Sequence, residues 1–162
     1  MTVSVNIDNR TSKHPCGFDI EKSIRKLLSH CESEHLVGLD KIIILDSFVG
    51  NKRACQGYYS RKHEQSKPTI YLSFDKIFWE KTTLPYCFRF VVRVNLSRVL
   101  YHEIGHHYHH TLKHGVKRKN AEEFAVQYQK QMMRKTAPKW RYILYPIHLI
   151  ILLINKIITN KT

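Results

Sequence analysis

The stretch His102-Glu103-Ile104-Gly105-His106 determines how the rest of the chain is interpreted. It lies in a segment with helical periodicity, and residues four apart on an α-helix share one face, one turn apart. Two imidazoles in that arrangement can bind one Zn²⁺, which takes nitrogen ligands at about 2.0–2.1 Å. Glu103 follows the first histidine, so its carboxylate lies beside the pair and can accept a proton from an activated water. The spacing therefore predicts a zinc site with His102 and His106 as ligands and Glu103 as general base.

The residues before this motif favour a buried helix. The segment contains an apolar run consisting of Phe90, Val91, Val92, Val94, Leu96, Val99 and Leu100. We expect one helix from about Phe88 to about Leu112, with Gly115 as its C-terminal stop. The alternative is a solvated, metal-buffering tract, since six of the 11 histidines lie between positions 102 and 114. The apolar run favours the helix, because a buried helix can hold a metal rigidly.

A catalytic zinc usually has three protein ligands, so a third must come from elsewhere in the chain. Glu122 and Glu123 stand at the start of a second predicted helix, Ala121 to about Lys135, with Asn120 as its N-cap. Glu122 is the favoured ligand, because its position leaves Phe124 free to face the core. Glu123 remains the alternative, and either acid also suits a helix N-terminus without a metal.

Other polar residues near the motif leave alternatives open. A second metal site would use a further histidine stripe, and His109 or His110 could replace the glutamate as third ligand. The stripe consists of His107, His110 and His114. Exposed histidines usually need no ligand, so one zinc is expected. The candidates for an oxyanion donor are Tyr101, Tyr108 and Tyr128, and the sequence does not choose among them.

The segment from Leu100 to His107 resembles the active-site helix of zincin metallopeptidases. It departs from the metzincin pattern, which has a glycine and a third histidine where this chain has His109 and Leu112. The gluzincin branch, with a glutamate on the next helix, is more similar, and its compact minigluzincins are closest in size. Their third ligand often precedes an aromatic and a small residue, as Glu122 precedes Phe124-Ala125 here.

The resemblance implies an α+β fold: a small zincin-like domain in which a short β-sheet precedes a metal-binding helix and a glutamate-bearing helix. It implies a zinc metalloendopeptidase with one Zn²⁺ held by His102, His106 and Glu122, acting on a protein or peptide substrate. It also implies that the last strand before the metal helix, Thr69–Phe74, borders the substrate cleft and pairs with an extended peptide.

Upstream of the motif the patterns are shorter. We expect an irregular lead-in over residues 1–18, a helix from Asp19 to about Cys31, and a helical turn over Asp75–Lys81. Three strands are expected, at Lys41–Asp46, Ala54–Tyr59 and Thr69–Phe74.

The C-terminal segment, residues 139–162, differs from the preceding domain, residues 1–138. Its apolar stretch of 17 residues, 142–158, would extend ~25 Å as a helix, near the lower limit for crossing a membrane. Basic and aromatic residues flank it, as at membrane interfaces. The sequence is compatible with a membrane anchor that spans or lies in the interface, and equally with a helix buried against the domain.

Composition bounds the remaining possibilities. With 27 basic and 13 acidic residues the formal charge is +14, which favours acidic partners without choosing among them. The alternative function is therefore a non-catalytic, zinc-containing binding module for nucleic acid or anionic membrane. None of the four cysteines forms a C-x-x-C pair, and Met1–Arg10 lacks the apolar core of a signal peptide. We expect reduced thiols and a cytoplasmic location, membrane-associated if the C-terminal helix is an anchor.

Overall fold

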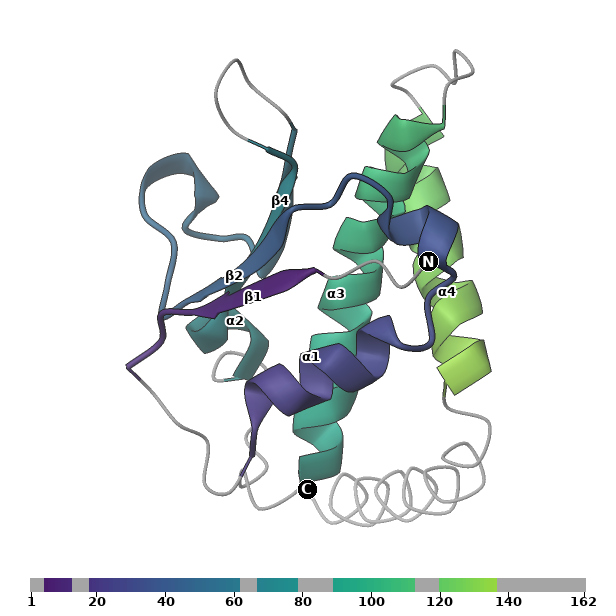
Figure 1. The fold of residues 1–162 in the computed structure, drawn as a ribbon. Helices are drawn as coiled ribbons and strands as arrows, with labels where there is room; N and C mark the ends of the chain where they lie inside the picture. Colours follow the sequence, from purple (N-terminus) through teal and green to yellow (C-terminus); the bar gives the residue numbers. More distant parts are fainter. Residues whose placement is uncertain (1–4, 13–17, 62–66, 79–88, 113–119, 137–162) are drawn as a thin grey trace, which may run out of the picture.

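The computed structural model describes residues 5–12, 18–61, 67–78, 89–112 and 120–136, with side chains of the long helix from Val92 onward. These residues form an α+β fold, in which a four-stranded mixed sheet packs against helices (Figure 1). The predicted fold class is therefore confirmed at the level of α+β.

The sheet has the strand order β1-β2-β4-β3. Strands β1 (Asn6–Asn9), β2 (Lys41–Leu45) and β4 (Thr69–Ser73) run parallel, and β3 (Gly57–Ser60) pairs antiparallel with β4. In the centre, Ile42 pairs with Ile70 and Ile44 with Leu72, and all four side chains are fully buried. Because side chains alternate along a strand, these residues form one continuous apolar face toward the helices.

The opposite face of the sheet has a smaller apolar cover. Ile43 is buried there, between its neighbours on the helix-facing side. The ring of Tyr58 stacks on Tyr71 with centroids 4.7 Å apart, and Phe48 packs edge-on against Tyr58 at 5.0 Å. Covering both faces explains why β2 has three consecutive buried isoleucines rather than an alternating pattern.

The helix α1 (Ile20–Leu28) covers the apolar face (Figure 1). Its first turn is capped by Asp19, whose side chain accepts a hydrogen bond of 2.8 Å from the backbone N–H of Lys22. Ile20, Ile24 and Leu27 point inward at helical spacing. Three short elements complete this part of the chain: the 3₁₀-helices η1 (Ser33–Leu36) and η2 (Gly50–Lys52), and α2 (Phe74–Phe78).

The long helix α3 (Arg89–Thr111) passes through the middle of the molecule, between the sheet and α4 (Figure 1). At about 1.5 Å per residue its 23 residues extend for roughly 35 Å. Leu96, Leu100, Tyr101 and Ile104 are fully buried, as expected for a helix packed on several sides. This burial gives the metal motif a rigid support.

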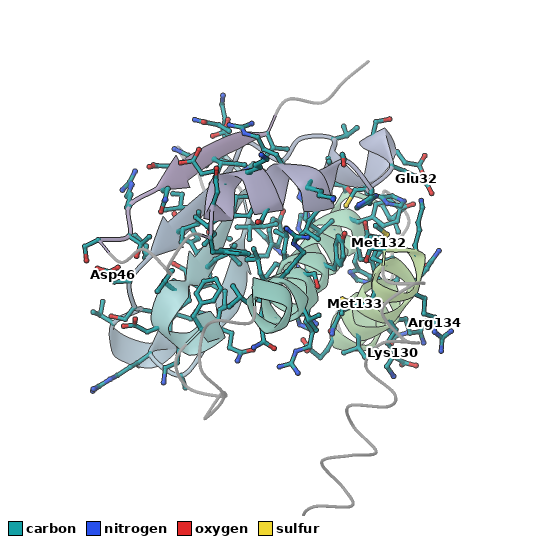
Figure 2. All side chains as sticks on the ribbon, turned by 90° about the horizontal axis from the view of Figure 1, so that it is seen from below. Glu32, Asp46, Lys130, Met132, Met133 and Arg134 are labelled. Carbon is teal, nitrogen blue, oxygen red and sulfur yellow. The ribbon has the colours of Figure 1, made fainter. Side chains whose placement is uncertain are left out.

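The helix α4 (Ala121–Thr136) packs along α3 through Ala125, Tyr128 and Met132. Figure 2 shows Met132 and Met133 on the side of α4 that faces α3, whereas Arg134 points away from the core. One face of α4 is therefore apolar and packed, and the other is exposed.

Within the described residues, the predicted helices and strands are confirmed, with ends that shift by a few residues, except at the N-terminus. The expectation of an irregular lead-in over residues 1–18 is wrong, because Asn6–Asn9 forms the edge strand β1. Val5 and Ile7 are buried while Asn6 is exposed, so a short period-2 pattern was present. The polar residues at the alternate positions and the turn residues that follow made this pattern hard to recognise in the sequence.

The predicted C-terminal helix, residues 139–162, and the predicted stop at Gly115 lie outside the described residues. Within the described part of the chain, no helix has both the length and the apolar character needed to cross a bilayer.

Candidate metal centre

The two motif histidines converge on one point. His102 and His106 are one turn apart on α3, and their Nε2 atoms lie 3.1 Å from each other. Both side chains are about one-fifth exposed, at 21% and 23%. Burial, and then the neighbouring His102, lower the pKa of His106, which favours the neutral imidazole that a metal requires.

Glu122 on α4 completes the group. Its Oε1 lies 3.2 Å from Nε2 of His102, and its Oε2 lies 3.2 Å from Nε2 of His106. The donor atoms of these three residues all lie within 4.8 Å of one another, so the group could hold a metal ion. The alternative ligand, Glu123, instead accepts a hydrogen bond of 3.2 Å from Gln127. The structure thus brings together the three predicted ligands.

The donor atoms lie about as far apart as ligands around a small metal ion. Zinc ligands at about 2.0–2.1 Å in tetrahedral arrangement stand about 3.3 Å apart. The two imidazole nitrogens lie 3.1 Å apart, and each lies 3.2 Å from a different oxygen of the Glu122 carboxylate. Two imidazoles and one carboxylate are also a donor set typical of catalytic zinc.

Two small residues allow α4 to approach α3 at this point. A Cβ built on Gly105 would lie 2.8 Å from Cα of Ala125, closer than side chains tolerate. Gly105 follows His102 by three residues, and Ala125 follows Glu122 by three, so each lies on the same helical face as its metal-site neighbour. The missing side chain at Gly105 therefore sets the distance at which Glu122 can reach both histidines.

Glu103 is a buried carboxyl group next to this centre, with only 5% of its surface exposed. Burial raises its pKa to about 8, and the charge of Glu122 acts in the same direction. A hydrogen bond from the backbone of Tyr59 and the charge of Lys52 oppose the shift. The predicted general base therefore has a proton affinity in the range that suits acid–base chemistry near neutral pH.

The strand beside the centre is β3, and the expectation that Thr69–Phe74 borders the cleft is wrong. β4 lies between β2 and β3, so both of its edges are already paired. The chain returns after β2 to place β3 outside β4, next to α3. A Cβ on Gly57 would come within 2.8 Å of Val99 and 3.2 Å of Cγ of Glu103. Only glycine allows β3 to lie this close to the general base.

The free edge of β3 faces the candidate site. The Ser73 N–H donates to the Gln56 carbonyl at 2.9 Å, which makes 56 and 73 a hydrogen-bonded pair. Backbone groups in an antiparallel ladder alternate in direction, so those of Gly57 and Tyr59 face away from β4. Accordingly, the backbone of Tyr59 forms a hydrogen bond with the Glu103 carboxyl group.

The other histidines of α3 have different roles. His107 is fully buried, with Nε2 3.1 Å from the carbonyl of Val37 and Nδ1 3.3 Å from the hydroxyl of Tyr59. It therefore ties α3 to the loop after η1 and to β3. His109 lines the cavity at the candidate centre, packs on Phe124 with centroids 5.1 Å apart, and is not in the metal group. His110 is exposed, and His114 lies outside the described residues.

The tyrosines predicted as oxyanion donors do not line the cavity. Tyr101 donates to the carbonyl of Leu27 at 3.2 Å, and Tyr128 lies 3.0 Å from Nδ1 of His35. The ring of Tyr108 packs against His35 at 4.2 Å. Among the described residues, the tyrosines that line the cavity are Tyr58 and Tyr59 on β3, which sequence reasoning missed because nothing in the pattern marks that strand as adjacent to α3.

A second group of possible ligands, Glu32, Glu34 and His35, lies at η1. Both glutamates are exposed, and Glu32 also lies 3.4 Å from the Lys135 ammonium. This group is a surface ion-pair cluster.

Comparisons of this chain with protein-family models, with curated proteins and with solved structures found no match.

Proposed function

We propose that this protein is a zinc-dependent metallopeptidase of the gluzincin type, with His102, His106 and Glu122 as metal ligands and Glu103 as general base. The observation that supports it most is the convergence of three donor atoms within 4.8 Å, beside a carboxyl group that is 5% exposed. A zincin-like fold is part of the same proposal, and its support is the order of sheet, motif helix and glutamate helix.

A zinc ion in such a site supplies Lewis acidity, which acidifies water and polarises a carbonyl. The chain's own contribution is proton transfer and positioning. Glu103 takes the proton of the attacking water and passes it to the leaving amine. The edge of β3 offers backbone groups at Gly57 and Tyr59 that can align an extended peptide beside Glu103.

A zinc-containing binding module is the competing interpretation. The position of Glu103 argues against it, because a structural metal site has no use for a buried carboxyl group that is not a ligand. Burying a carboxyl group lowers the stability of the fold. A catalytic role for Glu103 would explain why that cost is tolerated.

The decisive comparison uses Glu103→Gln, which is nearly isosteric, and Glu123→Gln as a matched control on an exposed glutamate. Both variants should retain one zinc per chain. Hydrolysis of a fluorescently labelled unfolded protein should fall at least 10²-fold in Glu103→Gln, because an amide cannot accept the proton, and should be unchanged in Glu123→Gln. Equal hydrolysis by Glu103→Gln and wild type would contradict the mechanism. Zinc binding without hydrolysis in wild type would favour the binding module.

A further inference from the structure

Two cavities that share lining residues form one groove along β3, and the candidate metal ligands line the first of them. The first has a volume of about 380 Å³ and extends toward Tyr59 and Arg61. The second, of about 440 Å³, extends toward Arg98 and Gln129. Both are lined by Gly57, His102 and Glu103, so a chain bound in the groove would pass the site and continue on either side of it.

Both cavities of the groove are lined by basic residues. Lys52 and Arg61 line the first cavity, and Arg98 lines the second. Among the described residues that line the groove, the carboxylates are Glu103 and Glu122, which the proposed function already assigns to the general base and the metal. Among the described lining residues, the three cationic side chains therefore outnumber the two carboxyl groups before the charge of a metal ion is added.

These cations are available to a ligand. All three are exposed, and among the described residues none forms an ion pair with a carboxylate. The Lys52 ammonium lies 5.1 Å from the ring centroid of Tyr58, and Arg98 donates to the side-chain oxygen of Gln56 at 3.3 Å. Neither contact neutralises the positive charge of the side chain.

We propose that the groove selects extended peptide segments with acidic side chains on both sides of the bond held at the centre. This inference rests on the proposed peptidase function and names its substrate class. Charged groups placed around a cleft raise the local concentration of oppositely charged ligands and reject ligands of the same sign. A lysine-rich segment would therefore be excluded by the same residues that bind an aspartate-rich one.

A peptide accounts for the groove better than a nucleic acid does. The outward-facing backbone of Gly57 and Tyr59 offers alternating donors and acceptors at the spacing of a β-ladder, which an extended polypeptide matches. Arg61 lines one cavity and Arg98 the other, so side chains on either side of a peptide bond held beside Glu103 could reach a cation.

The test measures binding by fluorescence anisotropy, with full-length, zinc-loaded Glu103→Gln protein and three labelled peptides of one length. The peptides are aspartate-rich, asparagine-rich and lysine-rich. At low ionic strength the acidic peptide should bind on the order of tenfold more tightly than its asparagine isostere, and the basic peptide should not bind. Because the chain carries a net charge of +14, any anion is attracted to some extent, so site variants are essential.

Arg61→Glu and Arg98→Glu should each weaken binding of the acidic peptide about fivefold, as expected for reversing an exposed charge pair. Arg134→Glu is the matched control, because it makes the same charge change on the exposed face of α4, outside both cavities. An equal effect of Arg134→Glu, or equal binding of acidic and neutral peptides, would overturn the proposal. Displacement of the peptide by single-stranded DNA, with the same dependence on Arg61 and Arg98, would overturn it in favour of nucleic acid.

The two proposals fail in different ways. If Glu103→Gln binds the acidic peptide selectively but the wild-type protein never hydrolyses it, the peptidase proposal is refuted and the groove preference stands. Hydrolysis of acidic and neutral peptides at equal rates would refute the preference and leave the peptidase standing.

Discussion

Gly105 on α3 and Ala125 on α4 touch through their backbones, and no side chain larger than hydrogen fits between them at Gly105. Both residues lie beside the candidate ligands, one between His102 and His106 in sequence and the other one turn after Glu122. The contact therefore couples the packing of two helices to the geometry of three donor atoms.

Gly105→Ala should weaken zinc binding and destabilise the fold. The new methyl group would lie 2.8 Å from Cα and 3.2 Å from the carbonyl oxygen of Ala125, so α4 must move away. Overpacking of this kind costs about 1–3 kcal/mol, whereas glycine to alanine in an unhindered helix stabilises by up to ~1 kcal/mol. Zinc titration and thermal unfolding check the prediction, and unchanged affinity together with a raised Tm would contradict it.

Gly57→Ala should separate β3 from α3. The Cβ would come within 2.8 Å of Cγ1 of Val99, so the strand or the side chain must shift. We expect a loss of about 1–3 kcal/mol in unfolding free energy and a lower rate of hydrolysis. Adding Val99→Ala removes the closest clash, so the double variant should lose less stability than the sum of the two single variants. Simple additivity would show that Gly57 and Val99 do not interact as described.

The metal-free protein should become less stable, relative to Glu103→Gln, as pH rises from about 5 to 8. Glu103 ionises near pH 4.5 when unfolded, but burial raises its pKa in the fold to about 8. Below the unfolded pKa both states are protonated and the group has no effect. Between the two values only the unfolded state loses its proton, which favours unfolding. Urea unfolding at pH 5 and pH 8 measures the difference, and a gap that does not widen would contradict the burial of Glu103.

Asp46→Ala should loosen the attachment of the N-terminal strand. Oδ1 of Asp46 accepts a hydrogen bond of 3.0 Å from the backbone N–H of Ser12, and Oδ2 accepts one of 2.8 Å from its hydroxyl. Thr11 also donates to this carboxylate. Losing these bonds should cost about 1–3 kcal/mol and increase amide exchange in β1 before other strands. Uniform exchange across the sheet would show that Asp46 does not anchor β1.

The helices were predictable because their signals are local. The Asp19 cap, the apolar spacing of α1 and the long apolar run of α3 each act within one or two turns, and the structure reproduces them. The histidine pair was equally local, since its geometry follows from a spacing of four on one helix. Predicting Glu122 required a further inference, because this residue lies on another helix. The helix-face argument favoured Glu122 over Glu123, and Glu122 is the residue that lies with the two histidines in the possible metal site.

The strand arrangement was not predictable, because register and order depend on contacts between distant segments. The resemblance to zincins suggested that Thr69–Phe74 borders the cleft, yet β3 takes that place by pairing with the outer edge of β4. The roles of Gly57 and Tyr59 follow only from that placement. The orientation of Tyr101 and Tyr128 into the core likewise depends on tertiary packing against Leu27 and His35.

Zinc content per chain, measured by mass spectrometry for wild type, Glu122→Ala and Glu123→Ala after dialysis against trace zinc, tests the central claim most directly. Glu122 lies 3.2 Å from both histidine nitrogens, whereas Glu123 points to Gln127. We expect one zinc in wild type and in Glu123→Ala, and almost none in Glu122→Ala. Loss of zinc in Glu123→Ala alone, or full zinc content in Glu122→Ala, would contradict the proposed metal centre.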